Sequence, residues 1–240
     1  MDEQLLGLPR GEIIFQRIKD FHVQRVSAVE KANVPLQRRE GGIIVLHLIP
    51  ESCVFSRSSF DGSTLKEHGT RIRPLGDSGG YTRFNVDGFM NYSGYQEVHA
   101  YSQLFRDGRL ENVMSDVGYP VNPHAENSPY AIRHGLIERA VFESITQYRQ
   151  FCQAVDAEPP VWLFSALVEC TGYRMATGRF RDLSEQAVDR SPAFLPELLL
   201  EDFETPIEQQ LRPWCDTFWQ ASGLERSFNY DEEGNWHEPR

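Results

Sequence analysis

The sequence predicts an α+β fold, in which a mostly antiparallel mixed sheet of about five or six strands packs with two long helices and a kinked C-terminal helix. Three observations support this fold class. Two long stretches repeat apolar residues every three or four positions, as amphipathic helices do. Between them lies a β-branched run typical of a buried strand, and an Asp-Gly pair separates two more strand-like runs. A chain of 240 residues with 40% hydrophobic content suffices for one large core, so we expect a single domain over residues 1–240.

The first helix is expected over about residues 11–32. Its apolar positions recur at roughly helical spacing: Ile14, Ile18, Phe21, Val26 and Val29. Asn33 and Pro35 follow, and proline cannot continue a helix and also restricts the residue before it.

The region from 42 to 115 is expected to be rich in strands. Residues 43–49 form a β-branched run that Pro50 stops, which predicts a buried strand. Residues 56–69 are polar and contain glycine, so they predict a loop. Residues 70–75 predict a short strand.

Two further strand predictions complete this region. Residues 81–92 alternate in polarity and predict one more strand. Arg106-Asp107-Gly108 lies between strand-like runs at 98–105 and 109–114, which predicts a hairpin.

The second half of the chain predicts mainly helix. Ser128 and Pro129 supply an N-cap and a first-turn proline, so the longest helix is expected over residues 129–156. A strand is expected at 161–170. The signal then weakens until a helical region at 206–223, which Pro213 should kink or split and Gly223 should cap.

The charge balance argues against nucleic acid as the main partner. The chain holds 24 basic and 35 acidic residues, a net charge of −11, which repels a phosphate backbone unless basic residues gather on one face. No apolar run reaches the length of about 20 residues needed to span a membrane, and no signal-peptide pattern opens the chain, so we expect no membrane association. The four cysteines are scattered, which predicts reduced thiols and a cytoplasmic location.

The segment Gly76-Asp77-Ser78-Gly79-Gly80 is identical to the segment around the nucleophilic serine of chymotrypsin-like proteases. That chemistry also needs a histidine base and an orienting aspartate on two β-barrels, and in that family both lie far upstream of the serine. Here only 77 residues precede Ser78, and they include a long helix. We therefore interpret the segment as a glycine-rich turn.

The histidines and acidic clusters predict no metal site and no cofactor. No pair of histidines has the spacing of a helical zinc site, and no His-x-His occurs. His47 is the one candidate catalytic residue, because a buried imidazole at the end of an apolar strand can be tuned, although a hydrogen-bonded core histidine is the simpler interpretation. The acidic runs at 201–204 and 231–233 have the composition of solvated surface, although converging carboxylates can hold Mg²⁺.

Basic and aromatic residues interleave in one stretch, which makes it the candidate nucleic-acid contact. Its members are Tyr173, Arg174, Arg179, Phe180 and Arg181. Arginine can pair with phosphate while aromatic rings stack on bases. Internal salt bridges are the alternative interpretation, and the net charge favours them.

Short motifs along most of the chain resemble a known group of proteins. They are Val34-Pro35-Leu36, the run from Ile44 to Pro50, the run from Arg83 to Gly88, the run from Leu104 to Gly108, Pro160-Val161, Gly172-Tyr173, the run from Leu211 to Asp216, and the run from Trp219 to Gly223. In this order they resemble the C-terminal region of uncharacterised bacterial proteins whose N-terminal domain is Alba-like, of the schlafen type, and is ascribed DNA binding. That domain is expected to be absent here, since residue 1 stands where the C-terminal region begins. The resemblance implies a module that accompanies a DNA-binding domain, and it supplies no catalytic residues.

The sequence by itself reveals no enzymatic activity. The function we expect is a non-catalytic accessory or regulatory module of such a bacterial system, whose partner is another protein or the missing N-terminal domain. A hydrolase or nuclease with a site assembled from dispersed acids and His47 is one alternative. Direct nucleic-acid binding through the Arg-rich segment 173–181 is the other.

Overall fold

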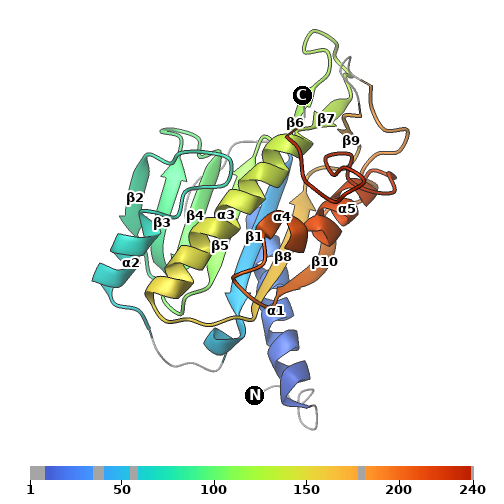
Figure 1. Cartoon of the computed structure of the whole chain (residues 1–240). Helices are drawn as coiled ribbons and strands as arrows, with labels where there is room; N and C mark the ends of the chain where they lie inside the picture. Colours follow the sequence, from blue (N-terminus) through green and yellow to red (C-terminus); the bar gives the residue numbers. More distant parts are fainter. Residues whose placement is uncertain (1–8, 35–40, 55–58, 178–181, 239–240) are drawn as a thin grey trace.

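A seven-stranded antiparallel sheet forms the centre of the molecule (Figure 1). The computed structural model describes residues 9–34, 41–54, 59–177 and 182–238. The strand order across the sheet is β10-β8-β1-β5-β4-β3-β2. The strands are β1 (Ile43–Pro50), β2 (Tyr81–Phe84), β3 (Gly88–Ser93), β4 (Ala100–Phe105), β5 (Leu110–Ser115), β8 (Val161–Val168) and β10 (Ala193–Leu200). The predicted α+β class is confirmed, with more strands than expected.

Helices cover both faces of the sheet. α1 (Arg10–Glu30) packs on one face over β1 and β8, and α3 (His134–Ala154) crosses the other (Figure 1). Two short helices, α4 (Ile207–Gln210) and α5 (Arg212–Gln220), lie beside α3 and β10. Because neighbouring residues of a strand point to opposite faces, β1 must be apolar on both, and all of its residues are buried.

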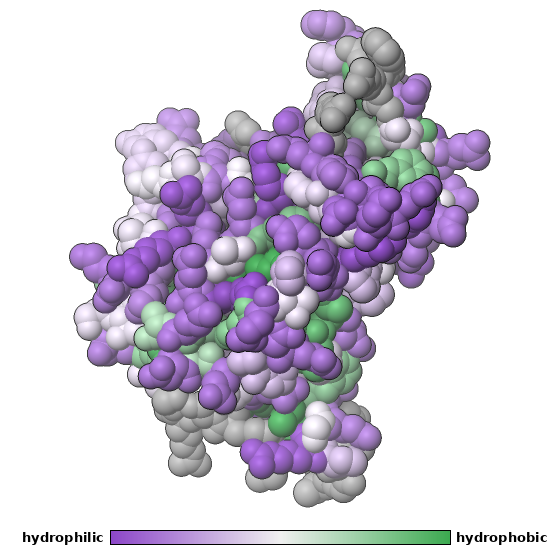
Figure 2. Space-filling model, viewed as in Figure 1, coloured by the Kyte–Doolittle hydropathy of each residue, from purple (hydrophilic) through white to green (hydrophobic). Residues whose placement is uncertain are grey.

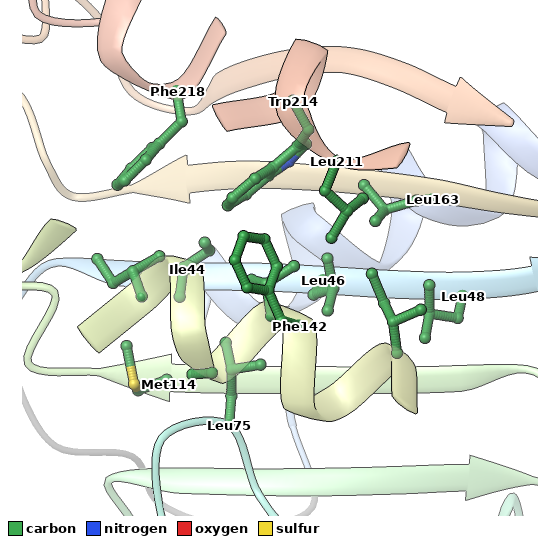
Figure 3. Packing of buried hydrophobic residues seen from close by; sticks show 14 of the residues in the cluster. Ile44, Leu46, Leu48, Leu75, Met114, Phe142, Leu163, Leu211, Trp214 and Phe218 are labelled. Carbon is green, nitrogen blue, oxygen red and sulfur yellow. The ribbon is translucent and has the colours of Figure 1, made fainter. Parts of the chain in front are cut away.

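The larger core lies on the α3 side of the sheet. Leu46 on β1, Phe142 on α3 and Trp214 on α5 meet there, and Phe142 points toward the indole (Figure 3). The indole N–H of Trp214 donates to Ser165 on β8 (2.8 Å), so the ring is buried without an unpaired donor. Each such buried side chain contributes about 1.5–3 kcal/mol, and this core therefore supplies most of the hydrophobic stabilisation.

The remaining elements are short. They are η2 (Glu51–Val54), α2 (Gly62–Gly69), β6 (Gly118–Pro120), β7 (Tyr130–Ile132) and β9 (Arg174–Met175). β6, β7 and β9 form a separate three-stranded sheet, in which β7 and β9 run parallel. Among the described residues, no helix is long and apolar enough to cross a membrane.

The clearest sequence signals gave correct elements. The helix expected at 11–32 is α1, the strand expected at 43–49 is β1, and the strand expected at 161–170 is β8. The predicted hairpin is formed by β4 and β5, where Gly108 takes the left-handed φ of 93° that favours glycine.

Four predictions in the strand-rich and central regions were wrong. The expected loop at 56–69 contains α2, whose N-cap Asp61 accepts a hydrogen bond from the Thr64 amide (2.8 Å). Residues 70–75 form no strand. The expected strand at 81–92 is a hairpin, β2 and β3, because the Asn85 side chain accepts from the Asp87 and Gly88 amides and turns the chain. The helix expected from 129 starts at His134, since the residues after Pro129 pair into β7.

The weak signal between 172 and 206 conceals two strands. These are β9 and β10, and β10 is interrupted by a register shift between Leu195 and Leu198. The C-terminal helical region is split as predicted, with α4 and α5 meeting at Leu211 and Pro213 lying in the first turn of α5.

Candidate functional site: a buried histidine and carboxylate network

The inner face of α1 carries two polar residues among apolar ones. Ile18, His22, Val26 and Val29 follow one another at steps of four, four and three, and all four are buried against the sheet. Arg25 lies beside them and reaches toward β5. The helix therefore presents an imidazole and a guanidinium to the interior.

Glu111 is the centre of the network. It lies on β5 directly opposite His47 on β1, and neither side chain is exposed to solvent. Arg25 donates two hydrogen bonds to it, from Nε to Oε2 (2.7 Å) and from Nη2 to Oε1 (2.6 Å). His47 Nε2 contacts Oε2 at 2.9 Å, and the Tyr101 hydroxyl donates to Oε1 at 3.0 Å. A buried carboxylate with this many donors is well compensated.

These contacts determine which ring nitrogens carry protons. Glu111 is a carboxylate and only accepts, so His47 Nε2 must be the donor. In a neutral ring the other nitrogen is then an acceptor, so His47 Nδ1 accepts from His22 Nδ1 across 2.7 Å. His22 Nε2 is left as a bare acceptor, and it receives no hydrogen bond within the described part of the chain.

The environment holds both histidines neutral and the ion pair charged. Burial, reinforced by His47, lowers the pKa of His22 to about 2. Burial also lowers the pKa of His47, although Glu111 opposes that shift. Burial alone would raise the pKa of Glu111, but the hydrogen bonds from Arg25 and His47 outweigh it and lower that pKa to about 2. Burial would likewise lower the pKa of Arg25, but Glu111 outweighs burial and raises it.

Aromatic rings enclose the network. The ring of Phe21 lies edge-on to His47 at 5.3 Å between centroids, and the ring of Phe164 lies 5.2 Å from that of His22. A hollow of about 390 Å³ lies beside β10 and α5, and its lining includes Phe194, whose ring lies 5.5 Å from the imidazole of His22. Another hollow, of about 300 Å³, lies next to Arg109. The linings of these two hollows include neither the histidines nor Glu111.

The hydrolase or nuclease alternative expects His47 to meet dispersed acids in one site. Convergence of His47 with two or more carboxylates in a pocket would favour that alternative; among the described residues, the carboxylate that contacts His47 is that of Glu111, and the imidazole is fully buried. Within the residues that the structure describes, no group of three or more histidine, cysteine, aspartate or glutamate side chains is arranged to hold a metal ion. The arrangement ties α1 to the sheet.

The protease-like segment forms a turn. Asp77 accepts hydrogen bonds from the Gly79 amide (3.1 Å), the Ser93 hydroxyl (2.6 Å) and His99 Nε2 (2.7 Å). The Ser78 hydroxyl donates instead to the neighbouring Gly79 carbonyl (3.5 Å). Asp77 and His99 therefore pair, but Ser78 takes no part, and the arrangement lacks the nucleophile-to-base contact of a triad.

A second buried carboxylate, Glu138 on α3, fastens the C-terminal segment. It is fully buried and accepts hydrogen bonds from Trp219 (2.8 Å), Ser227 (3.0 Å), Asn229 (2.7 Å) and Trp236 (2.6 Å). All four donors are neutral. Because three of them come from the chain beyond α5, this carboxylate holds that segment against α3.

The candidate nucleic-acid segment is only partly described. Tyr173 stacks on Tyr130 at 4.8 Å between centroids, and its hydroxyl accepts from the Gly42 amide (3.2 Å). Arg174 donates to the Ser184 carbonyl (3.2 Å). Arg179, Phe180 and Arg181 lie outside the described residues. The two residues that can be placed make internal contacts.

Sequence reasoning found His47 and missed its partners. His22 had a usable signal, because it lies four residues after Ile18 and four before Val26 on the apolar stripe of α1. Glu111 had none that distinguished it from an exposed strand residue. Its burial follows from its position beside β1 in the sheet.

Comparison with known proteins identifies no relative: no protein-family model, no curated protein and no solved structure matches this chain.

Proposed function

We propose that this chain is a non-catalytic accessory or regulatory module that acts through contacts with another protein, in a bacterial system of the schlafen-type, Alba-like kind that its motifs resemble. One observation carries the proposal. Large apolar side chains are exposed along β2 and at both of its ends, and they include Val86, which lies between β2 and β3, and Tyr95, which follows β3; their exposed fractions are 88% and 86%. Exposed apolar groups that gather in one place mark interaction surfaces more often than isolated ones do.

The internal chemistry of the molecule supports a non-catalytic role. The rings of Phe21 and Phe164 lie against the two histidines of this cluster, and Arg25 balances the charge of Glu111. The four thiols are unpaired and buried, which supports a cytoplasmic location and disfavours them as nucleophiles. Burial raises the pKa of Cys53 to about 12, well above physiological pH.

The proposal is tested with a purified Alba-like, schlafen-type domain as the partner. Isothermal titration with the wild-type chain should give saturable binding, and the double variant Val86→Asp, Tyr95→Asp should weaken it at least tenfold. The matched control is Val23→Asp on α1, an exposed apolar position (44%) away from this surface, which should bind like wild type. Absence of binding by the wild type, or equal loss in the control, would rule the proposal out.

A further inference from the structure

The strand β2 forms an open edge of the central sheet. It pairs with β3 on one side and is last in the strand order (Figure 1). The Asn85 amide donates to the Gly88 carbonyl (3.0 Å), which makes that pair hydrogen-bonded. Antiparallel pairs alternate between bonded and non-bonded, so Thr82 and Phe84 occupy non-bonded pairs with β3. Their amide and carbonyl groups therefore point outward, away from the sheet.

The opposite edge of the sheet is protected. β10 carries Pro196, which has no amide proton, and a register shift between Leu195 and Leu198. α5 also packs against it. The four residues of β2 contain no proline and no register shift, so this edge of the sheet lacks the features that protect the β10 edge.

Apolar side chains line the open edge on both faces of the sheet. On the α1 face, Tyr81 stacks on Tyr92 with centroids 5.5 Å apart, and Tyr95 follows at 6.3 Å. On the other face, Phe84 packs edge-on against Phe89 at 5.0 Å. Figure 2 shows pale residues of intermediate hydropathy on this side of the molecule, between purple hydrophilic ones. The side chains of an added strand would point alternately to the two faces of the sheet, and on each face they would meet apolar residues of this edge.

The size of the edge selects the kind of partner. Four residues at about 3.3 Å each span roughly 13 Å. A stable dimer usually buries about 800 Å² on each partner, which pairing of two such short edges does not supply. A second copy would also bring a like net charge of −11. A short extended segment of another protein needs much less area.

We propose that β2 receives an extended apolar segment of a partner protein as an additional strand, through the outward backbone groups of Thr82 and Phe84. This inference rests on the proposed function, since it names how the same surface binds its partner. The backbone provides the affinity, and the aromatic side chains on either face select apolar residues over acidic ones.

The test uses random 12-residue peptides displayed on phage and selected against the wild-type chain. The enriched sequences are then made as synthetic peptides and titrated by fluorescence anisotropy. Thr82→Pro removes one outward amide and leaves the bonds to β3 in place, because the Thr82 pair is a non-bonded one. We expect a loss of at least tenfold in affinity. The matched control Thr82→Val retains the amide and should bind within twofold of wild type.

A second measurement does not depend on the folding of any variant. The selected peptide is N-methylated at alternate positions, and methylation of the set that faces β2 should abolish binding while methylation of the other set should not. Equal binding by all methylated peptides would overturn strand addition.

The remaining outcomes separate the two proposals. Binding that Val86→Asp, Tyr95→Asp abolishes and Thr82→Pro leaves intact would refute strand addition and retain the docking surface. Binding that neither variant changes, or no enrichment at all, would refute both. Concentration-dependent dimerisation that Thr82→Pro removes would make the occupant a second copy and refute the partner segment.

Discussion

Replacing Arg25 with methionine tests the buried network most directly. The change removes both hydrogen bonds to Glu111, of 2.6 and 2.7 Å, and leaves a carboxylate with zero exposed side-chain surface facing only two neutral donors. Breaking a buried ion pair by removing one partner costs about 3–5 kcal/mol. The Arg25 side chain is itself 19% exposed, so we expect the lower end of that range, about 3 kcal/mol.

Urea unfolding at pH 7, followed by far-UV circular dichroism, measures this loss. The control is Arg71→Met, which removes an arginine that contacts Glu67 at 3.2 Å where both side chains are more than half exposed. Exposed pairs contribute less than about 1 kcal/mol, so the control should barely shift the midpoint. Equal losses in the two variants would show that burial does not strengthen the Arg25 pair, and would refute the reasoning.

A double-mutant cycle identifies the source of the loss. In a Glu111→Gln background, Arg25→Met leaves no unpaired buried charge, because the neutral amide needs no cation. The double variant should therefore lose about 2 kcal/mol less than the sum of the single losses. Additive losses would mean that Arg25 stabilises α1 through packing of its stem instead.

Two further predictions follow from the buried ionisable groups. Burial lowers the pKa of His22 to about 2, so this ring stays neutral in the folded chain but titrates near 6.5 in the unfolded chain, and burial also lowers the pKa of His47. Below pH 6.5 the unfolded chain therefore binds more protons, and the unfolding free energy measured in urea should fall by up to about 1.4 kcal/mol per pH unit from His22, with a further decrease from His47. A flat profile from about pH 6.5 to pH 5 would contradict this. Glu138→Gln replaces an acceptor oxygen with an NH₂ group that faces four donors, so the free energy of unfolding should fall by about 2–3 kcal/mol. Limited proteolysis should then cut the segment after α5 more readily. Unchanged protection from proteolysis would show that this carboxylate does not hold the segment.

The parts of the fold that could be predicted are those whose signal is local. Residues 43–49 form a strand because a β-branched run bounded by glycines and Pro50 suits a strand buried on both faces. The β4–β5 hairpin turns at Gly108, where the positive φ requires the residue that the sequence supplies.

The elements that were predicted wrongly depend on contacts between distant residues or on side-chain hydrogen bonds, which the pattern of apolar residues does not show. The turn between β2 and β3 has Val86 and Asp87 at its centre, and the Asn85 side chain holds it by accepting hydrogen bonds from the Asp87 and Gly88 amides. β10 contains Pro196, which argues against a strand anywhere but at an edge. Whether a strand is an edge strand depends on the order of the whole sheet.

The network was out of reach for the same reason. His47 and Glu111 are 64 residues apart, and Arg25 and Glu111 are 86 apart. Their meeting depends on the register between β1 and β5 and on the rotation of α1 above them. A one-residue shift of β5 would turn Glu111 to the α3 face, and the same shift of β1 would turn His47 there.

That dependence gives the network a physical role that needs no catalysis. The aliphatic contacts of α1, such as those of Ile18, Val26 and Val29, are non-directional and by themselves select its position along the sheet only weakly. A slide of about 5.4 Å would separate Arg25 from Glu111 and leave a buried carboxylate without its cation, at a cost of several kcal/mol. Only one placement of α1 satisfies the apolar stripe and the carboxylate together. The buried charges therefore select the position of the helix, and a variant with both charges replaced should stay folded while the protection of α1 amides from hydrogen exchange falls.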